Sequence, residues 1–85
     1  MRLVSWDGRR DVSYENCHLV INPKTFEIEA ITGNTNFEPV MGIYSTEDKA
    51  LKAMEMLRKE YLETVYDYRT KPKVFKFPVD EEVEV

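Results

Sequence analysis

The sequence has little of the side-chain chemistry on which many small domains depend. Among its 85 residues, Cys17 is the only cysteine and His18 the only histidine. A single cysteine excludes an internal disulfide and a multi-cysteine zinc site, and it is typical of a reducing intracellular compartment. Adjacent residues of a strand point to opposite faces, so we expect Cys17 and His18 to form neither a metal site nor a nucleophile–base pair.

Glycine is scarce as well, and the motifs of common enzymes are missing. The three glycines, Gly8, Gly33 and Gly42, are too scattered for a phosphate-binding loop. The sequence has no HExxH, GxSxG or CxxC motif. Carboxylates are plentiful, but Glu27 and Glu29 are expected to share a solvated strand face, whereas acid–base catalysis needs a desolvated carboxylate facing a pocket. We therefore predict a non-enzymatic protein without a catalytic residue, a metal or a cofactor.

Long apolar runs are also absent. No run approaches the roughly 20 residues of a membrane span, and the charged turn at residues 7–10 follows the opening residues too soon for a signal peptide. The net charge of −4 argues against nonspecific nucleic-acid binding, which needs many cations. We expect a cytoplasmic protein that binds neither a membrane nor nucleic acid directly.

One amphipathic helix is the clearest element of the sequence. Between residues 50 and 65, apolar residues recur at three- and four-residue spacing, which places them on one helical face. These residues are Ala50, Ala53, Met54, Leu57, Tyr61 and Val65. Ser45 is the expected N-cap, with Asp48 three residues later, and Lys71-Pro72 would end any continuation. One helix with one apolar face needs a sheet to lie on.

Turn residues and period-two patterns predict strands on both sides of that helix. Asp7-Gly8 is a signal for a two-residue type I′ hairpin, which would place Leu3 opposite Val12 and Ser5 opposite Arg10. Further strands are predicted over residues 17–22, 25–32, 37–44 and 73–79.

The predicted fold class is α+β, with an antiparallel sheet of about four or five strands packed against the single helix. The expected order of elements is β-β-β-β-α-β. We predict a single domain over residues 1–79, followed by an acidic C-terminal tail over residues 80–85.

A basic turn beside the only tryptophan is the strongest candidate for a ligand site. Trp6 precedes the Asp7-Gly8 turn, and Arg9 and Arg10 follow it. Indole and guanidinium groups are favoured anchors at binding sites, and a ring that stacks on a base together with arginines that grip a phosphate suits a nucleotide. The competing interpretation is a cation–π pair that only steadies the hairpin.

Two further groups of residues are candidates for contacts with a partner. Met56 and Leu62 lie off the inner face of the helix, so we expect an assembly of copies to use them. Asp80, Glu81 and Glu82 belong to the acidic tail, which could imitate nucleic-acid phosphates or dock on a basic groove. Alternatively, the valines of this tail could add a strand to the sheet edge of a neighbour. Composition alone favours a disordered solubilising tail, whose removal would leave the fold intact.

Three segments of the chain resemble small uncharacterised phage and prophage proteins of Gram-positive bacteria. They are MRLVSWDG (1–8) followed by Tyr14-Glu15, YSTEDKALKAMEMLR (44–58) and FKFP (75–78). The resemblance covers roughly half of the chain, and its motifs are structural, so it carries over no site residue. It implies an accessory factor that acts on host machinery in the bacterial cytoplasm. Antagonists of bacterial immunity are prominent among such proteins.

Three functions remain open from the sequence. The leading hypothesis is counter-defence, in which a homo-oligomer sequesters a nucleotide-type immune signal of the host. The first alternative is a protein–protein inhibitor of a host nuclease, CRISPR or other, which acts through an acidic surface. The second alternative is a structural or regulatory phage accessory protein.

Overall fold

A computed structural model of the chain describes residues 1–33, 38–66 and 74–85, and of residues 64–66 the backbone alone. These ranges contain one α-helix, α1 (Glu47–Tyr66), and six strands. The strands are β1 (Arg2–Val4), β2 (Asp11–Ser13), β3 (Cys17–Ile21), β4 (Glu27–Thr32), β5 (Val40–Ile43) and β6 (Val74–Lys76). Two 3-10 turns, η1 (Tyr14–Asn16) and η2 (Asp80–Glu82), complete the fold. The α+β class predicted from the sequence is confirmed.

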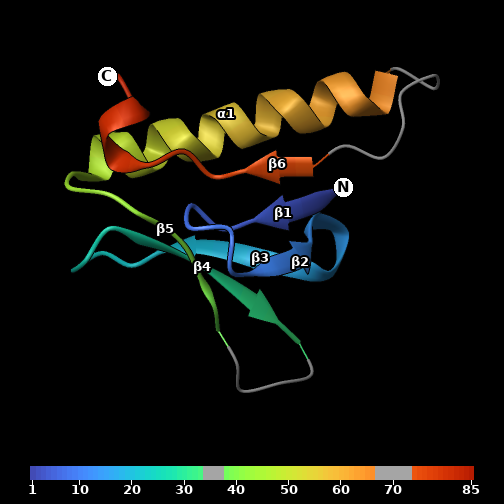
Figure 1. Ribbon diagram of the computed structural model, residues 1–85, viewed down its shortest axis with the longest axis horizontal. Coiled ribbons are helices and arrows are strands. Elements are labelled where there is room, and N and C mark those ends of the chain that lie inside the picture. Colours follow the sequence, from blue (N-terminus) through green and yellow to red (C-terminus); the bar gives the residue numbers. More distant parts are fainter. Residues whose placement is uncertain (34–37, 67–73) are drawn as a thin grey trace.

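The strands form two small sheets, where the sequence predicts a single antiparallel one. Their orders are β2-β1-β6 and β3-β4-β5, and all neighbours are antiparallel except β1 and β6, which are parallel. A parallel pair needs a long crossover connection. Here the chain passes through α1 before it returns as β6 alongside β1 (Figure 1). The order of elements is therefore β-β-β-β-β-α-β.

The first hairpin has the predicted register but a different turn. Leu3 pairs with Val12, and the Ser5 N–H donates to the Arg10 carbonyl at 2.9 Å. The turn is closed by a bond from the Gly8 N–H to the Ser5 carbonyl at 2.9 Å. Of the two central residues of this turn, Asp7 and Gly8, only Gly8 has a positive φ, of 75°. The type I′ prediction is therefore wrong, because that turn needs a positive φ at both central residues.

In the second hairpin, Phe26 belongs to the turn, although the sequence predicts that it lies in a strand. Asn22 Oδ1 accepts from the backbone N–H groups of Lys24 and Thr25, at 2.9 and 3.3 Å, and so stabilises the turn. Phe26 then takes a φ of 60°, which is uncommon for a residue with a side chain. The strand predicted to begin at residue 25 begins instead at Glu27.

Helix α1 is capped by Thr46 and not by Ser45. Thr46 Oγ1 accepts from the Lys49 N–H at 3.2 Å, the bond that an N-cap makes to the third helical residue. Ser45 is not available for this role, because its own N–H and hydroxyl donate to Asp80 at 2.8 and 3.1 Å. The predicted helix end at Lys71-Pro72 lies outside the described residues.

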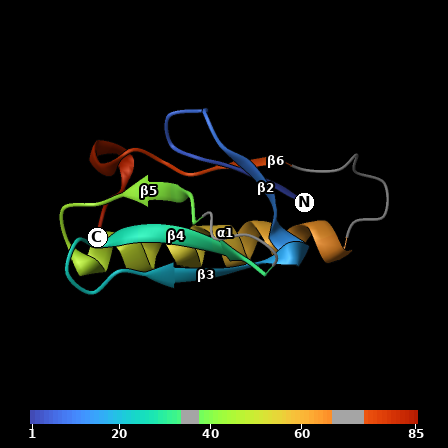
Figure 2. The same ribbon diagram turned by 90° about the horizontal axis from the view of Figure 1, so that it is seen from below.

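Helix α1 lies against both sheets, where the sequence predicts one sheet (Figures 1 and 2). Ala50, Ala53 and Leu57 are buried, whereas Met54 and Tyr61 are half-buried; the side chain of Val65 lies outside the described residues. The rest of the core comes from the strands and the C-terminal segment, namely Leu3, Ile28, Ala30, Met41, Tyr44, Phe75, Phe77 and Val83. In the described part of the chain, no helix combines the length and apolar character of a membrane span.

Candidate binding cleft

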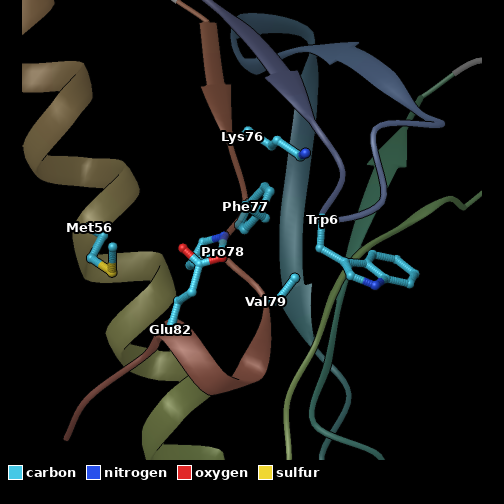
Figure 3. A pocket seen from close by; sticks show the side chains of 7 residues that line it. All are labelled: Trp6, Met56, Lys76, Phe77, Pro78, Val79 and Glu82. Carbon is cyan, nitrogen blue, oxygen red and sulfur yellow. The ribbon is translucent and has the colours of Figure 1, made fainter.

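A cleft of about 340 Å³ lies where the first hairpin, α1 and the C-terminal segment meet. Its lining residues are Trp6, Met56, Lys76, Phe77, Pro78, Val79 and Glu82. Figure 3 shows Met56 on α1 at one side and Trp6 at the other, with residues 76–79 running between them. This volume is at the lower end of the range for small-molecule sites.

Trp6 is positioned by both sheets. Its backbone N–H donates to the Met41 carbonyl of β5 at 3.0 Å, and its half-buried ring packs against the core. The buried Ser5 hydroxyl donates to Asp7 Oδ1 at 2.5 Å and accepts from the Arg10 N–H at 3.1 Å. The bond from Ser5 helps to hold the pKa of the Asp7 carboxyl below its usual range. The turn that presents the indole is therefore tied down by hydrogen bonds.

Only one of the three residues of the predicted ligand site lines the cleft. Trp6 lines the cleft, but neither the exposed Arg9 nor the half-buried Arg10 belongs to its lining. The cation in the cleft is Lys76, which pairs with Val4 in the parallel register of β1 and β6. The alternation around Lys76 indicates that it points away from the core. Its proximity to the hairpin depends on a long-range parallel pairing that no local pattern reveals.

The C-terminal segment is folded onto the body, so the prediction of a disordered tail is wrong. Val83 is buried, with 3 % of its surface exposed. Asp80 Oδ1 accepts from the Ser45 N–H and hydroxyl, and Asp80 Oδ2 lies 3.4 Å from Lys49 Nζ. The Tyr44 hydroxyl donates to the Pro78 carbonyl at 2.9 Å. Removing residues 80–85 would therefore damage the fold and one wall of the cleft.

Of the acidic residues predicted to contact a partner, only some remain accessible. Asp80 is occupied by Ser45 and Lys49, whereas Glu81 and Glu82 are exposed. Glu82 also lines the cleft, as part of the wall that the C-terminal segment forms. The composition of this segment suggested solubility, but burial of its apolar residue Val83 outweighs that tendency.

We expect the stability of the fold to decrease on acidification below about pH 4, near the usual pKa of a carboxyl group. Bonds from the Ser45 amide and hydroxyl and the nearby Lys49 ammonium lower the pKa of Asp80 in the folded state. A carboxyl whose pKa is lowered by folding stabilises the fold above its unfolded pKa, and this contribution is lost as the pH falls through the folded pKa. Thermal unfolding followed by circular dichroism from pH 7 to pH 2 measures this loss.

The variant Asp80→Asn isolates the contribution of this carboxylate. Its unfolding midpoint should lie below that of the parent at pH 7, and the two midpoints should converge at low pH because both side chains are then neutral. Glu81→Gln is the matched control, because Glu81 is exposed and its neighbour Asp80 makes the contacts to α1. A constant difference between Asp80→Asn and the parent at every pH would contradict the assignment.

Met56 lines both this cleft and a second one, and its side chain is more buried than the sequence predicts. The second cleft, of about 260 Å³, is lined by Met56, Lys59, Glu60, Glu63 and Phe75. Met56 is half-buried and packs against the core. The sequence predicts that a monomeric core does not need Met56, and this prediction is wrong because Met56 packs against that core. Leu62, by contrast, is 55 % exposed.

The remaining candidate residues do not converge on a reactive centre. Cys17 is half-buried and His18 exposed, in a strand whose burial alternates residue by residue. Burial raises the pKa of the Cys17 thiol, which disfavours the thiolate form needed for a nucleophile. Among the described residues, no three histidine, cysteine or acidic side chains are close enough to hold a metal ion.

The cleft offers groups for recognition of a small molecule. The indole of Trp6 supplies a flat apolar surface, Lys76 a positive charge and Glu82 a hydrogen-bond acceptor. Apolar side chains from α1 and the C-terminal segment form the walls around them. In comparisons with known proteins, no family model, no curated protein and no solved structure matches this chain.

Proposed function

We propose that this chain is a non-enzymatic, phage-type binding protein that antagonises host defence by sequestering a nucleotide-type immune signal as an oligomer. The observation that carries the proposal is the half-buried Trp6 in a cleft that also contains Lys76. An aromatic face stacks on a nucleobase, and an ammonium group pairs with a phosphate.

The shape and charges of the cleft support a ligand of this class. About 340 Å³ suits a base with its sugar better than a large molecule. Glu82 can accept a hydrogen bond from an exocyclic amine or a sugar hydroxyl, and Lys76 can bind the phosphate. Arg9 is exposed on the adjoining turn and adds positive charge near the site.

A panel of cyclic nucleotides is expected to contain a compound that raises the unfolding midpoint of the protein, because ligands that bind the folded state stabilise it. Lys76→Glu should weaken binding of that compound at least tenfold by calorimetry, because a charge-assisted hydrogen bond contributes roughly 1.5–3 kcal/mol. Trp6→Ala should also abolish the shift. Protein purified from a bacterial host should carry bound nucleotide, which mass spectrometry of the denatured extract detects.

Lys24→Glu is the matched control for Lys76→Glu. It makes the same change of charge at an exposed turn residue that is not part of either cleft, so its binding should equal that of the parent. If no nucleotide of the panel moves the midpoint and the purified protein carries none, the sequestration proposal fails.

A protein–protein inhibitor of a host nuclease is the second candidate, favoured by the exposed glutamates of the C-terminal segment. Asp80 is committed to its contacts with α1, but Glu81 and Glu84 are exposed on the outside of the same segment. Charge reversal at these two positions should abolish protection of phage under this alternative. It should leave nucleotide binding unchanged, and this outcome separates the two candidates without damage to the fold.

A further inference from the structure

The outer face of α1 carries a narrow stripe of four exposed residues. Leu51, Glu55, Arg58 and Leu62 follow one another at spacings of four, three and four residues. This spacing places them on one line along the helix, as in the seam of a coiled coil. All four side chains are exposed, and the two leucines are 45 % and 55 % exposed. The stripe is on the side of the helix away from Ala53 and Leu57, which face the core.

We infer that this stripe, Leu51-Glu55-Arg58-Leu62, binds the same stripe of a second copy of the chain, with the two helices antiparallel. The stripe is chemically symmetric, with a leucine at each end and opposite charges between them. A twofold axis between Met56 and Leu57 places Leu51 against Leu62 of the second copy. The same axis places Glu55 against Arg58 of the second copy, and the reverse pair forms at the same time.

The charges of the stripe favour an antiparallel second copy over a parallel one. A parallel arrangement in register would place Glu55 against Glu55 and Arg58 against Arg58, and like charges at close range are destabilising. The antiparallel arrangement instead makes two opposite-charge pairs, each between two leucine contacts. Among the described residues, the stripe forms one long ion pair, from Lys52 to Glu55 at 3.9 Å. An arginine of the second copy can replace this weak partner of Glu55.

The neighbouring surfaces fit the same arrangement. Figure 1 shows α1 along one edge of the molecule, with both sheets to one side of it and the C-terminal segment crossing its first turns. A second helix can therefore lie along the opposite side without meeting a strand. The two clefts border the flank of α1 that carries Met56, not the flank that carries the stripe, so the dimer leaves them accessible.

The stripe dimer rests on the proposed function, because it specifies the oligomer named there. Its test uses no nucleotide, so the dimer and the nucleotide binding can each fail without the other. Sedimentation velocity and native mass spectrometry, from about 1 μM to about 1 mM protein, should show the mass rise from 10.1 kDa towards twice that value. Two leucines per copy form a small apolar contact, so we expect a weak, concentration-dependent dimer.

Charge exchange provides the decisive variants. Glu55→Arg alone and Arg58→Glu alone each place like charges opposite one another, and each should raise the dissociation constant about tenfold or more. The double variant Glu55→Arg/Arg58→Glu restores both pairs and should restore dimerisation. All four positions are exposed, so circular dichroism should show an unchanged fold.

Val74→Ser is the matched control for Leu62→Ser. Val74 is 63 % exposed on β6 and lies outside the stripe, so its replacement should leave the dissociation constant unchanged, whereas Leu62→Ser should weaken the dimer. A protein that stays at the monomer mass up to about 1 mM overturns the inference. So does a double charge exchange that fails to rescue the single variants.

Discussion

Replacement of Val83 by alanine is expected to lower the free energy of unfolding by about 2 kcal/mol. Val83 is 3 % exposed and belongs to the hydrophobic core, although it lies among four acidic residues near the C-terminus. Removing two buried methyl groups loses their transfer free energy and leaves a cavity between η2 and the core. For a domain of this size, such a loss is a substantial part of the total stability.

Val85→Ala is the control for this prediction. Val85 has the same side chain and similar neighbours in sequence, but it is 78 % exposed. Urea unfolding followed by circular dichroism should give the same midpoint for Val85→Ala and the parent, and a lower one for Val83→Ala. Equal midpoints for both variants would mean that the C-terminal segment is not packed as described. Cleft binding should weaken only in Val83→Ala, because Glu82 and Val79 form part of the cleft wall.

Gly42→Ala is expected to destabilise the fold by about 1–3 kcal/mol, as overpacking of a core does. A Cβ atom at this position would lie 2.6 Å from Cε2 and 2.7 Å from Oη of Tyr44. The ring cannot easily move away, because Tyr44 is buried and its hydroxyl donates to the Pro78 carbonyl at 2.9 Å. The strain should therefore also loosen the segment that carries the cleft wall.

Gly33→Ala separates this clash from the general effect of replacing a glycine. A Cβ atom at Gly33 would meet nothing within 4 Å, and this residue does not have a positive φ. Alanine there should be neutral or slightly stabilising, because it restricts the unfolded chain. Chemical denaturation of both variants measures the difference. If Gly42→Ala were as stable as Gly33→Ala, the close approach of Tyr44 to β5 would be refuted.

Local patterns predict much of this fold. The spacing of Ala50, Ala53 and Leu57 identifies the buried face of α1. The Asp7-Gly8 turn gives the register of Leu3 with Val12, although the turn type differs. These features depend on residues close together in the sequence, where helical periodicity and turn chemistry are informative.

The candidate site depends on contacts between distant residues, and these could not be predicted. Lys76 comes beside the hairpin only through the parallel pairing of β6 with β1. Ser45 fits the N-cap pattern as well as Thr46 does, and the choice is made by Asp80, which takes the hydrogen bonds of Ser45. The charged composition of residues 80–85 also gives no sign that Val83 is buried, because average polarity does not reveal where a single side chain packs.

The parallel pairing of β1 with β6 has a consequence for the kinetics of folding. Arg2 pairs with Val74, so the first strand, which pairs with β2 locally, finds its second partner only after nearly all of the other elements have been synthesised. The β3-β4-β5 sheet is built from consecutive hairpins and can form early, whereas the β2-β1-β6 sheet must close a long loop. Non-local pairing of this kind slows folding. The two sheets should therefore form in succession, and the cleft, whose lining includes Lys76 of β6 and the segment that follows it, should be the last part of the molecule to form.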